Sequence, residues 1–130
     1  MSSTSSVARA APSHVYAGVI SNKTDKPVLC TIHYSSGPNR QHEETISVKL
    51  DCGGQACIPE REYQPTPETP FICRKIISRL DVQTDEQTFS VEQPFDGVTY
   101  PVTEWRFDVH NDHVASVNPN ARIKTLESNE

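Results

Sequence analysis

The sequence predicts an all-β protein: an antiparallel β-sandwich, or a partly open barrel, of about eight to nine short strands. Three observations predict this class. Short segments of alternating apolar and polar residues recur along the chain. Clusters of turn-forming residues separate them at intervals of roughly 8 to 12 residues. The chain of 130 residues also has no room for the several crossover helices that a mainly parallel sheet needs.

The length fits a single domain, expected at residues 14–123, because two domains would each be too small to bury a stable core. The segment 1–13 is rich in Ser and Ala, and the segment 124–130 is polar. Both are expected to be disordered tails.

The N-terminal half contains three predicted strands. Residues 15–22 carry apolar side chains in both alternating sets, which is typical of a strand covered on both faces. Residues 28–34 follow a polar turn that ends in Pro27, so we expect these two strands to form a hairpin. Residues 45–50 show the clearest alternation. Their buried face carries Ile46, Val48 and Leu50.

Two glycines mark the end of the third strand. Gly53 and Gly54 can adopt positive φ, and a short strand is expected to return at residues 55–58. Consecutive glycine amides can also bind an anion. A Gly-Gly pair is more often a simple hairpin connection, which is our interpretation here.

A proline-rich segment follows at residues 59–70, with four prolines among polar residues. Proline lacks the N–H that a strand ladder uses, so we expect an extended surface loop with no ladder through it. Residues 63–67 could serve as a polyproline-like ligand for a partner.

The apolar spacing of residues 71–82 fits both a helix over 71–79 and a strand over 75–84. The turn-like residues 85–87 and the strand-like residues 88–91 favour the strand. Further along, Pro101 interrupts a short extended piece and suggests an exposed sheet edge.

The segment around Trp105 predicts both a fold element and a candidate site. Trp105, Phe107 and Val109 alternate with polar residues, and Asn111-Asp112 suits a two-residue hairpin turn. We expect the two aromatic side chains near the middle of the core. Its other expected members are Ile32, Ile46, Val48 and Leu80.

This turn would place His110 and His113 opposite each other on the solvent face, with Cα atoms about 5.5 Å apart. Asp108 would lie diagonally within reach. Two imidazoles and a carboxylate could hold a divalent metal, although zinc sites normally use three or four protein ligands. His33 or His42 would have to be recruited from another strand. We therefore assign no catalytic, cofactor-binding or metal-ligating residue, and no cofactor.

Composition limits the partners. The formal net charge is −5 and Lys and Arg are scattered, so no binding to nucleic acid or to an anionic membrane is expected. No segment has the roughly 18 apolar residues of a membrane span, and the N-terminus lacks the apolar stretch of a secretory signal. We expect a soluble, cytoplasmic protein. Asn22-Lys23-Thr24 matches the glycosylation pattern, which matters only in a secreted chain.

Without a secretory signal, the four cysteines are expected to be reduced. The spacing between Cys52 and Cys57 is looser than the C-x-x-C of common zinc sites. The sequence places neither a histidine nor a helix N-terminus beside these two thiols to lower their pKa. We therefore do not expect either cysteine to be a nucleophile.

Three functions from different classes are consistent with these residues. The leading hypothesis is a non-enzymatic binding module that engages a protein partner through its loops or an edge strand. The first alternative is a metal-dependent protein or small enzyme that uses Asp108, His110 and His113. The second alternative is a carrier of a small apolar ligand between the sheets.

Overall fold

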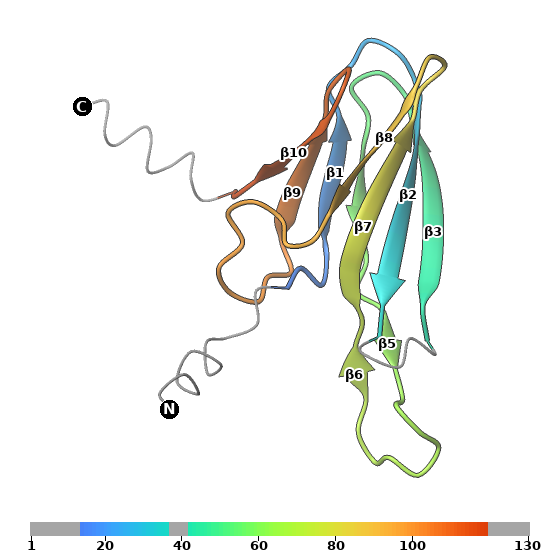
Figure 1. The fold of residues 1–130 in the computed structure, drawn as a ribbon, viewed down its shortest axis with the longest axis vertical. Helices are drawn as coiled ribbons and strands as arrows, with labels where there is room; N and C mark the ends of the chain where they lie inside the picture. The colour runs from blue at the N-terminus through green and yellow to red at the C-terminus, as the bar shows by residue number, and fades with distance from the viewer. Residues whose placement is uncertain (1–13, 37–41, 120–130) are drawn as a thin grey trace, which may run out of the picture.

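The computed structural model describes residues 14–36 and 42–119 and is a β-sandwich, as the sequence predicts (Figure 1). The first sheet has the strand order β10-β9-β1-β4, and the second has the order β3-β2-β7-β8. The first sheet consists of β1 (Gly18–Asn22), β4 (Gln55–Ile58), β9 (Trp105–Val109) and β10 (Val114–Val117). The second consists of β2 (Val28–Ser35), β3 (Glu44–Leu50), β7 (Ile76–Gln83) and β8 (Thr88–Glu92). A separate pair is formed by β5 (Glu62–Tyr63) and β6 (Cys73–Arg74).

Most predicted strands are confirmed, including the strand at β7 rather than a helix over residues 71–79. The predicted tails, and residues 120–123 of the predicted domain, lie outside the described residues. No helix in the described part of the chain is long and apolar enough to cross a bilayer.

The expected hairpin between the first two strands is wrong, because β1 and β2 belong to different sheets. β1 pairs in antiparallel fashion with β4 and in parallel fashion with β9. β2, which we expected to pair with β1, pairs with β3 and β7 instead. The connection between β3 and β4 also crosses from one sheet to the other. Residues 23–27 and 51–54 are therefore links between the sheets and not hairpin turns within a sheet.

A buried asparagine explains why the chain crosses at residues 23–27. Asn22 is 1% exposed. Its Nδ2 shares its protons among the carbonyl oxygens of Lys26, Leu50 and Asp51, at 2.8, 3.1 and 3.1 Å. Its Oδ1 accepts from Thr24 N at 2.9 Å and from Thr24 Oγ1 at 2.7 Å. The Asn-Lys-Thr motif therefore has a structural role, tying β1 to the ends of the neighbouring strands.

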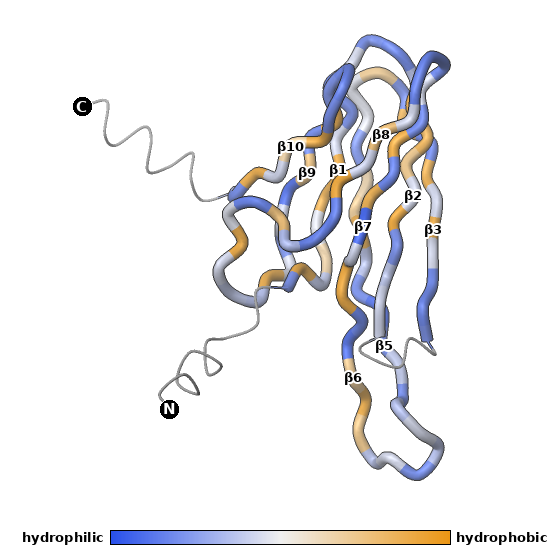
Figure 2. Tube along the Cα trace, in the orientation of Figure 1, coloured by the Kyte–Doolittle hydropathy of each residue, from blue (hydrophilic) through white to orange (hydrophobic). Residues whose placement is uncertain are grey.

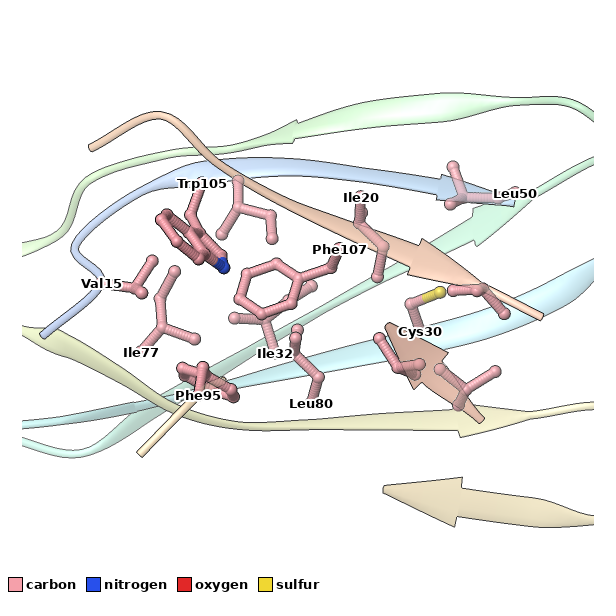
Figure 3. Packing of buried hydrophobic residues seen from close by; sticks show 14 of the residues in the cluster. Val15, Ile20, Cys30, Ile32, Leu50, Ile77, Leu80, Phe95, Trp105 and Phe107 are labelled. Atoms are coloured by element: carbon pink, nitrogen blue, oxygen red, sulfur yellow. The ribbon is translucent and has the colours of Figure 1, made fainter. Parts of the chain in front are cut away.

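The core lies between the two sheets (Figure 3), and the predicted Trp105, Phe107, Ile32 and Leu80 are all buried there. Ile46 and Val48 are only half-buried, because they lie on the edge strand β3. The indole Nε1 of Trp105 donates to Ser116 Oγ at 2.8 Å. The Ser116 hydroxyl in turn donates to the carbonyl of Asp96, in the loop between β8 and β9. The polar atom of the largest core side chain is thus satisfied.

The segment around Pro101 is not a free edge. Val102 N donates to His14 O at 3.0 Å, and Tyr16 N donates to Val102 O at 2.8 Å. Val102 also forms a parallel bridge with Val15. Because both backbone groups of Val102 are paired, this segment offers no template for strand addition at that residue.

Candidate functional site

Residues 59–75 form a hairpin that extends beyond the lower end of both sheets (Figure 1); we call it the arm. Its ladder pairs Glu62 with Arg74 and Tyr63 with Cys73. The expectation that no ladder runs through the proline-rich segment is wrong at these positions. The prolines at 65, 67 and 70 lie in the connecting loop, where no ladder hydrogen bond is required of them.

The base of the arm is fixed to the sandwich by an ion cluster. Lys75 Nζ lies 2.8 Å from Glu44 Oε1, and Arg61 Nε lies 3.2 Å from Glu44 Oε2. The Lys75 side chain is only 10% exposed, so the ion pair with this carboxylate offsets part of the cost of burying its ammonium group. Nearby, Tyr34 Oη donates to the carbonyl of Pro59 at 2.6 Å, and burial raises the pKa of that phenol to about 12.

The tip of the arm is held by its own hydrogen bonds. Gln64 Nε2 donates to Thr69 O at 2.7 Å, and Thr69 N donates to Thr66 O at 3.1 Å. The hydroxyls of Thr66 and Thr69 lie 2.6 Å apart. These bonds, together with the fixed φ of the prolines, reduce the number of conformations that the loop can adopt.

Two large apolar side chains are exposed immediately after this tip. Phe71 and Ile72 are each 57% exposed, more than the other large exposed apolar residues of the described chain, Leu29 and Tyr100. Figure 2 shows the apolar stretch on the chain just below β6. Sequence reasoning missed this pair, because adjacent apolar residues beside an apolar strand are normally buried. Pro70, which separates the pair from the polar tip, was the available signal.

The opposite end of the sandwich carries the predicted histidine pair. The two-residue turn is confirmed: His110 N donates to His113 O at 2.8 Å. The two imidazole rings stack with centroids 4.9 Å apart. They line an open cleft of about 670 Å³, which we call the apical cleft. Its walls are residues 23–26, 28, 84–87 and 110–113.

The other residues predicted for this site lie elsewhere. Both carboxylate oxygens of Asp108 face the Arg106 guanidinium, at 3.3 and 3.4 Å. His42 stacks against Tyr63 of the arm, with centroids 5.1 Å apart. The structure thus brings together only two of the groups proposed to hold a metal. In the described ranges, no three His, Cys, Asp or Glu side chains converge in a way that could hold a metal ion.

His33 belongs to a polar network on the outer face of the second sheet. Its Nε2 lies 2.7 Å from Asp81 Oδ2, while Arg79 Nε and Ser90 Oγ donate to Asp81 Oδ1 at 2.7 and 2.6 Å. Burial raises the pKa of Asp81, but the hydrogen bonds from Ser90, Arg79 and His33 outweigh it and lower the pKa below the ordinary value. The carboxylate is the centre of the network, so no serine–histidine contact of the kind a nucleophile needs is formed here.

The amides of the Gly53-Gly54 turn do not converge on an anion site, because both donate to carbonyl groups within the protein. Gly53 N donates to Asn22 O at 3.1 Å, and Gly54 N donates to Asp51 O at 2.8 Å. The four cysteines carry free thiols. Burial raises the pKa of Cys30 to about 11, whereas Cys52 and Cys57 are exposed.

Comparison of the chain with known protein families, with curated protein sequences and with solved structures finds no match. The arm and the apical cleft are therefore the features of the protein from which its function can be inferred.

Proposed function

We propose that the protein is a non-enzymatic interaction module whose arm inserts Phe71 and Ile72 into an apolar pocket of a protein partner. The observation that carries this proposal is the exposure of both side chains, 57% each, at the end of a projecting hairpin. Adjacent apolar side chains that project from a surface are typical anchors of protein–protein contacts.

The internal bonds of the arm support a binding role. A loop that must become ordered on binding loses affinity for each side chain and backbone unit that it immobilises. The bonds among Gln64, Thr66 and Thr69 restrict the tip before any partner arrives, and the Glu44 cluster fixes its base. The arm is therefore preorganised, and more of the apolar burial energy remains for affinity.

The charges of the arm favour a protein over a lipid surface. Between Tyr63 and Cys73 the one charged residue is Glu68, an acidic side chain. Anionic headgroups would repel it, and the arm tip has no Lys or Arg to attract them. A partner pocket with an apolar floor and a neutral or basic rim fits this tip best.

Site-specific photo-crosslinking tests the proposal. A benzoylphenylalanine is placed at position 71 of the full chain, and in a matched control at position 100, where Tyr100 is 44% exposed. The probe at position 71 is expected to capture a defined partner that the probe at position 100 does not. The captured partner is then purified and its affinity for the protein is measured.

A second variant tests whether removing the tip of the arm abolishes binding. In this variant an Asn-Gly turn replaces residues 64–72 and closes β5 onto β6. The purified partner is expected to lose binding to this variant. Equal affinity for the full chain and the shortened arm would overturn the proposal. So would identical crosslinks from positions 71 and 100, or tight binding to vesicles of anionic lipid in place of a protein.

A further inference from the structure

The strand β3 forms one edge of the second sheet and has a neighbouring strand on one side only. It pairs with β2 along its whole length, from Glu44 to Leu50, and is the outermost strand of that sheet (Figure 1). In an antiparallel ladder alternate residues turn their N–H and C=O groups toward one neighbour, so the other residues of β3 turn theirs outward. Within the described ranges, residues 44–49 form no backbone hydrogen bond outside the ladder with β2.

This edge has little of the usual protection against another strand. Sheet edges are commonly protected by short strands, prolines, bulges or lysines. β3 has seven residues, whereas the other edge strands, β4, β8 and β10, have four or five. It contains no proline, its ladder with β2 has no register shift, and Lys49 is its one lysine. Of the four edges in the two sheets, β3 is therefore the most open to strand addition.

The inner face of β3 is incompletely covered. Ile46 and Val48 pack against the core but remain half-buried. A further strand in the same sheet would cover these two side chains. The strand that fits this position best carries apolar residues at alternate positions on the same face, because directly opposed side chains stabilise a pair of strands.

We propose that this strand is β3 of a second copy, and that the protein forms a two-fold symmetric dimer through one continuous sheet. When the two-fold axis passes beside Ser47, two antiparallel copies of β3 match at every residue of the strand. Ile46 of each copy then lies opposite Val48 of the other, and Thr45 lies opposite Lys49. The next registers that keep the inner faces aligned leave two residues of each strand unpaired.

The charges of β3 also permit this register. Glu44 and Lys49 are its only charged residues, and they lie on opposite faces of the strand. Glu44 is already paired with Arg61 and Lys75 at the base of the arm. Lys49 of each copy lies opposite Thr45, which is neutral. The ladder of the dimer therefore places no two like charges directly opposite each other.

The oligomeric state of the full chain, without an affinity tag, is the first test. The chain carries Cys52→Ser and Cys57→Ser, so that exposed thiols do not link two copies. One short ladder buries less surface than a standard interface, and the dimer is expected to dissociate at about 10 to 100 µM. Sedimentation velocity between about 5 and 500 µM is expected to show a monomer that gives way to a dimer.

A disulfide across the two-fold axis tests the register. In the same background, Ser47→Cys is expected to oxidise to a covalent dimer, because directly opposed Cα atoms lie about 4.5 to 5.5 Å apart. Thr45→Cys and Lys49→Cys are expected to crosslink when the two variants are mixed, and much less when each is alone. Ser90→Cys, at the middle of the β8 edge, is the matched control and is expected to remain monomeric.

Charge substitutions at Thr45 test the same register without a new covalent bond. Thr45→Glu places a carboxylate opposite Lys49 of the second copy and is expected to strengthen the dimer about fivefold. Thr45→Lys is expected to weaken it by about the same factor, and adding Lys49→Glu should restore it. Thr31→Lys, on the same face of β2, is the matched charge control and should leave dimerisation unchanged. None of these exposed changes should alter the melting temperature of the dilute monomer.

The inference is overturned if the chain is monomeric at about 500 µM, or if Ser47→Cys and Ser90→Cys crosslink equally. It is also overturned if Thr45→Glu and Thr45→Lys change the dimer in the same direction, or if β3 binds a different protein without self-association. These outcomes are independent of the proposed function, because antiparallel pairing of β3 places the two arms at opposite ends of the dimer. Thr45→Lys should leave the crosslinking result at position 71 unchanged.

Discussion

The two ends of the sandwich use their side chains in opposite ways. At the apical end the chain buries a polar residue, Asn22, and satisfies it through bonds to two segments of the chain, residues 24–26 and 50–51. At the other end the arm exposes two large apolar residues, Phe71 and Ile72, on a loop with its own internal bonds. The first arrangement stabilises the fold and the second leaves apolar surface unburied.

This difference indicates that stability and recognition are separated in the molecule. The apical crossings hold the two sheets together around the core, so their loss should unfold the whole domain. The arm is anchored by the Glu44 cluster at its base and can change without loss of the core. Substitutions at the two ends should therefore differ in the size and in the extent of their effects.

The largest effect on stability is expected from Asn22→Ala. The substitution removes all five hydrogen bonds of the Asn22 side chain and leaves the buried Leu50 carbonyl and the buried Thr24 N–H without this partner, whereas Lys26 O keeps the bond from Thr24 Oγ1. Leaving such groups unpaired costs roughly 1 to 3 kcal/mol each, so the free energy of unfolding should fall by about 3 kcal/mol. Denaturant unfolding of the original protein and of the variant measures this difference in the free energy of unfolding. A loss below about 0.5 kcal/mol, the size of an ordinary surface substitution, would show that Asn22 does not hold the two sheets together.

A smaller and more local effect is expected from Glu44→Gln. This change leaves Lys75 buried without its counter-ion, and because Glu44 itself is 32% exposed we expect a loss of about 2 kcal/mol, not the full cost of a deeply buried pair. The double variant Glu44→Gln/Lys75→Met removes the stranded charge and should recover most of the loss. If the double variant is no more stable than Glu44→Gln, the buried charge is not the cause.

The stability of the protein is expected to depend on pH through Asp81, which lies on the outer face of the second sheet, between the two ends. Its folded-state pKa lies below the unfolded value, so its network stabilises the protein above the ordinary aspartate pKa of about 4, and this stability is lost as the pH falls through the folded value. Because the group is partly exposed, the contribution should be about 1 kcal/mol or less. Asp81→Asn should lower stability near neutral pH and flatten the acid limb of the stability curve. An unchanged acid limb would contradict this account.

Thiol labelling sharpens the comparison without any change in the core. In the native protein at about pH 8, the exposed Cys52 and Cys57 should react first. Half-buried Cys73 on β6 should react more slowly, at the rate at which the arm opens. Cys30 should react last, since it is buried and its pKa is raised to about 11. Mass spectrometry of the labelled peptides gives the order, and equal rates for Cys30 and Cys73 would mean that the arm opens only with the whole domain.

Sequence reasoning predicted the strands better than their partners. Period-two burial gives the inward face of β3 or β9 directly, which is why Ile46, Val48 and Phe107 point into the shared layer as expected. The same pattern does not specify which strand lies alongside. Residues 23–27 have the composition of a hairpin turn, but the long-range bonds of Asn22 carry the chain into the other sheet.

The candidate sites show the same limit. The Asn111-Asp112 turn is a local signal, so the juxtaposition of His110 and His113 could be predicted. The orientation of Asp108 could not, because Arg106, the neighbour that binds it, competes with any metal for the same carboxylate. The exposure of Phe71 also could not be predicted, since it depends on where β5 and β6 leave the sandwich.

The most direct test of the separation of stability from recognition is the double variant Phe71→Ser/Ile72→Ser, measured for both properties beside the matched control Leu29→Ser/Tyr100→Ser. The variant is expected to bind the crosslinked partner at least about tenfold more weakly, a difference of about 1.4 kcal/mol, while its free energy of unfolding stays within about 0.5 kcal/mol of the original. The control is expected to change neither property. Unchanged affinity together with a loss of stability above about 2 kcal/mol would show that the pair is part of the fold and not a binding surface.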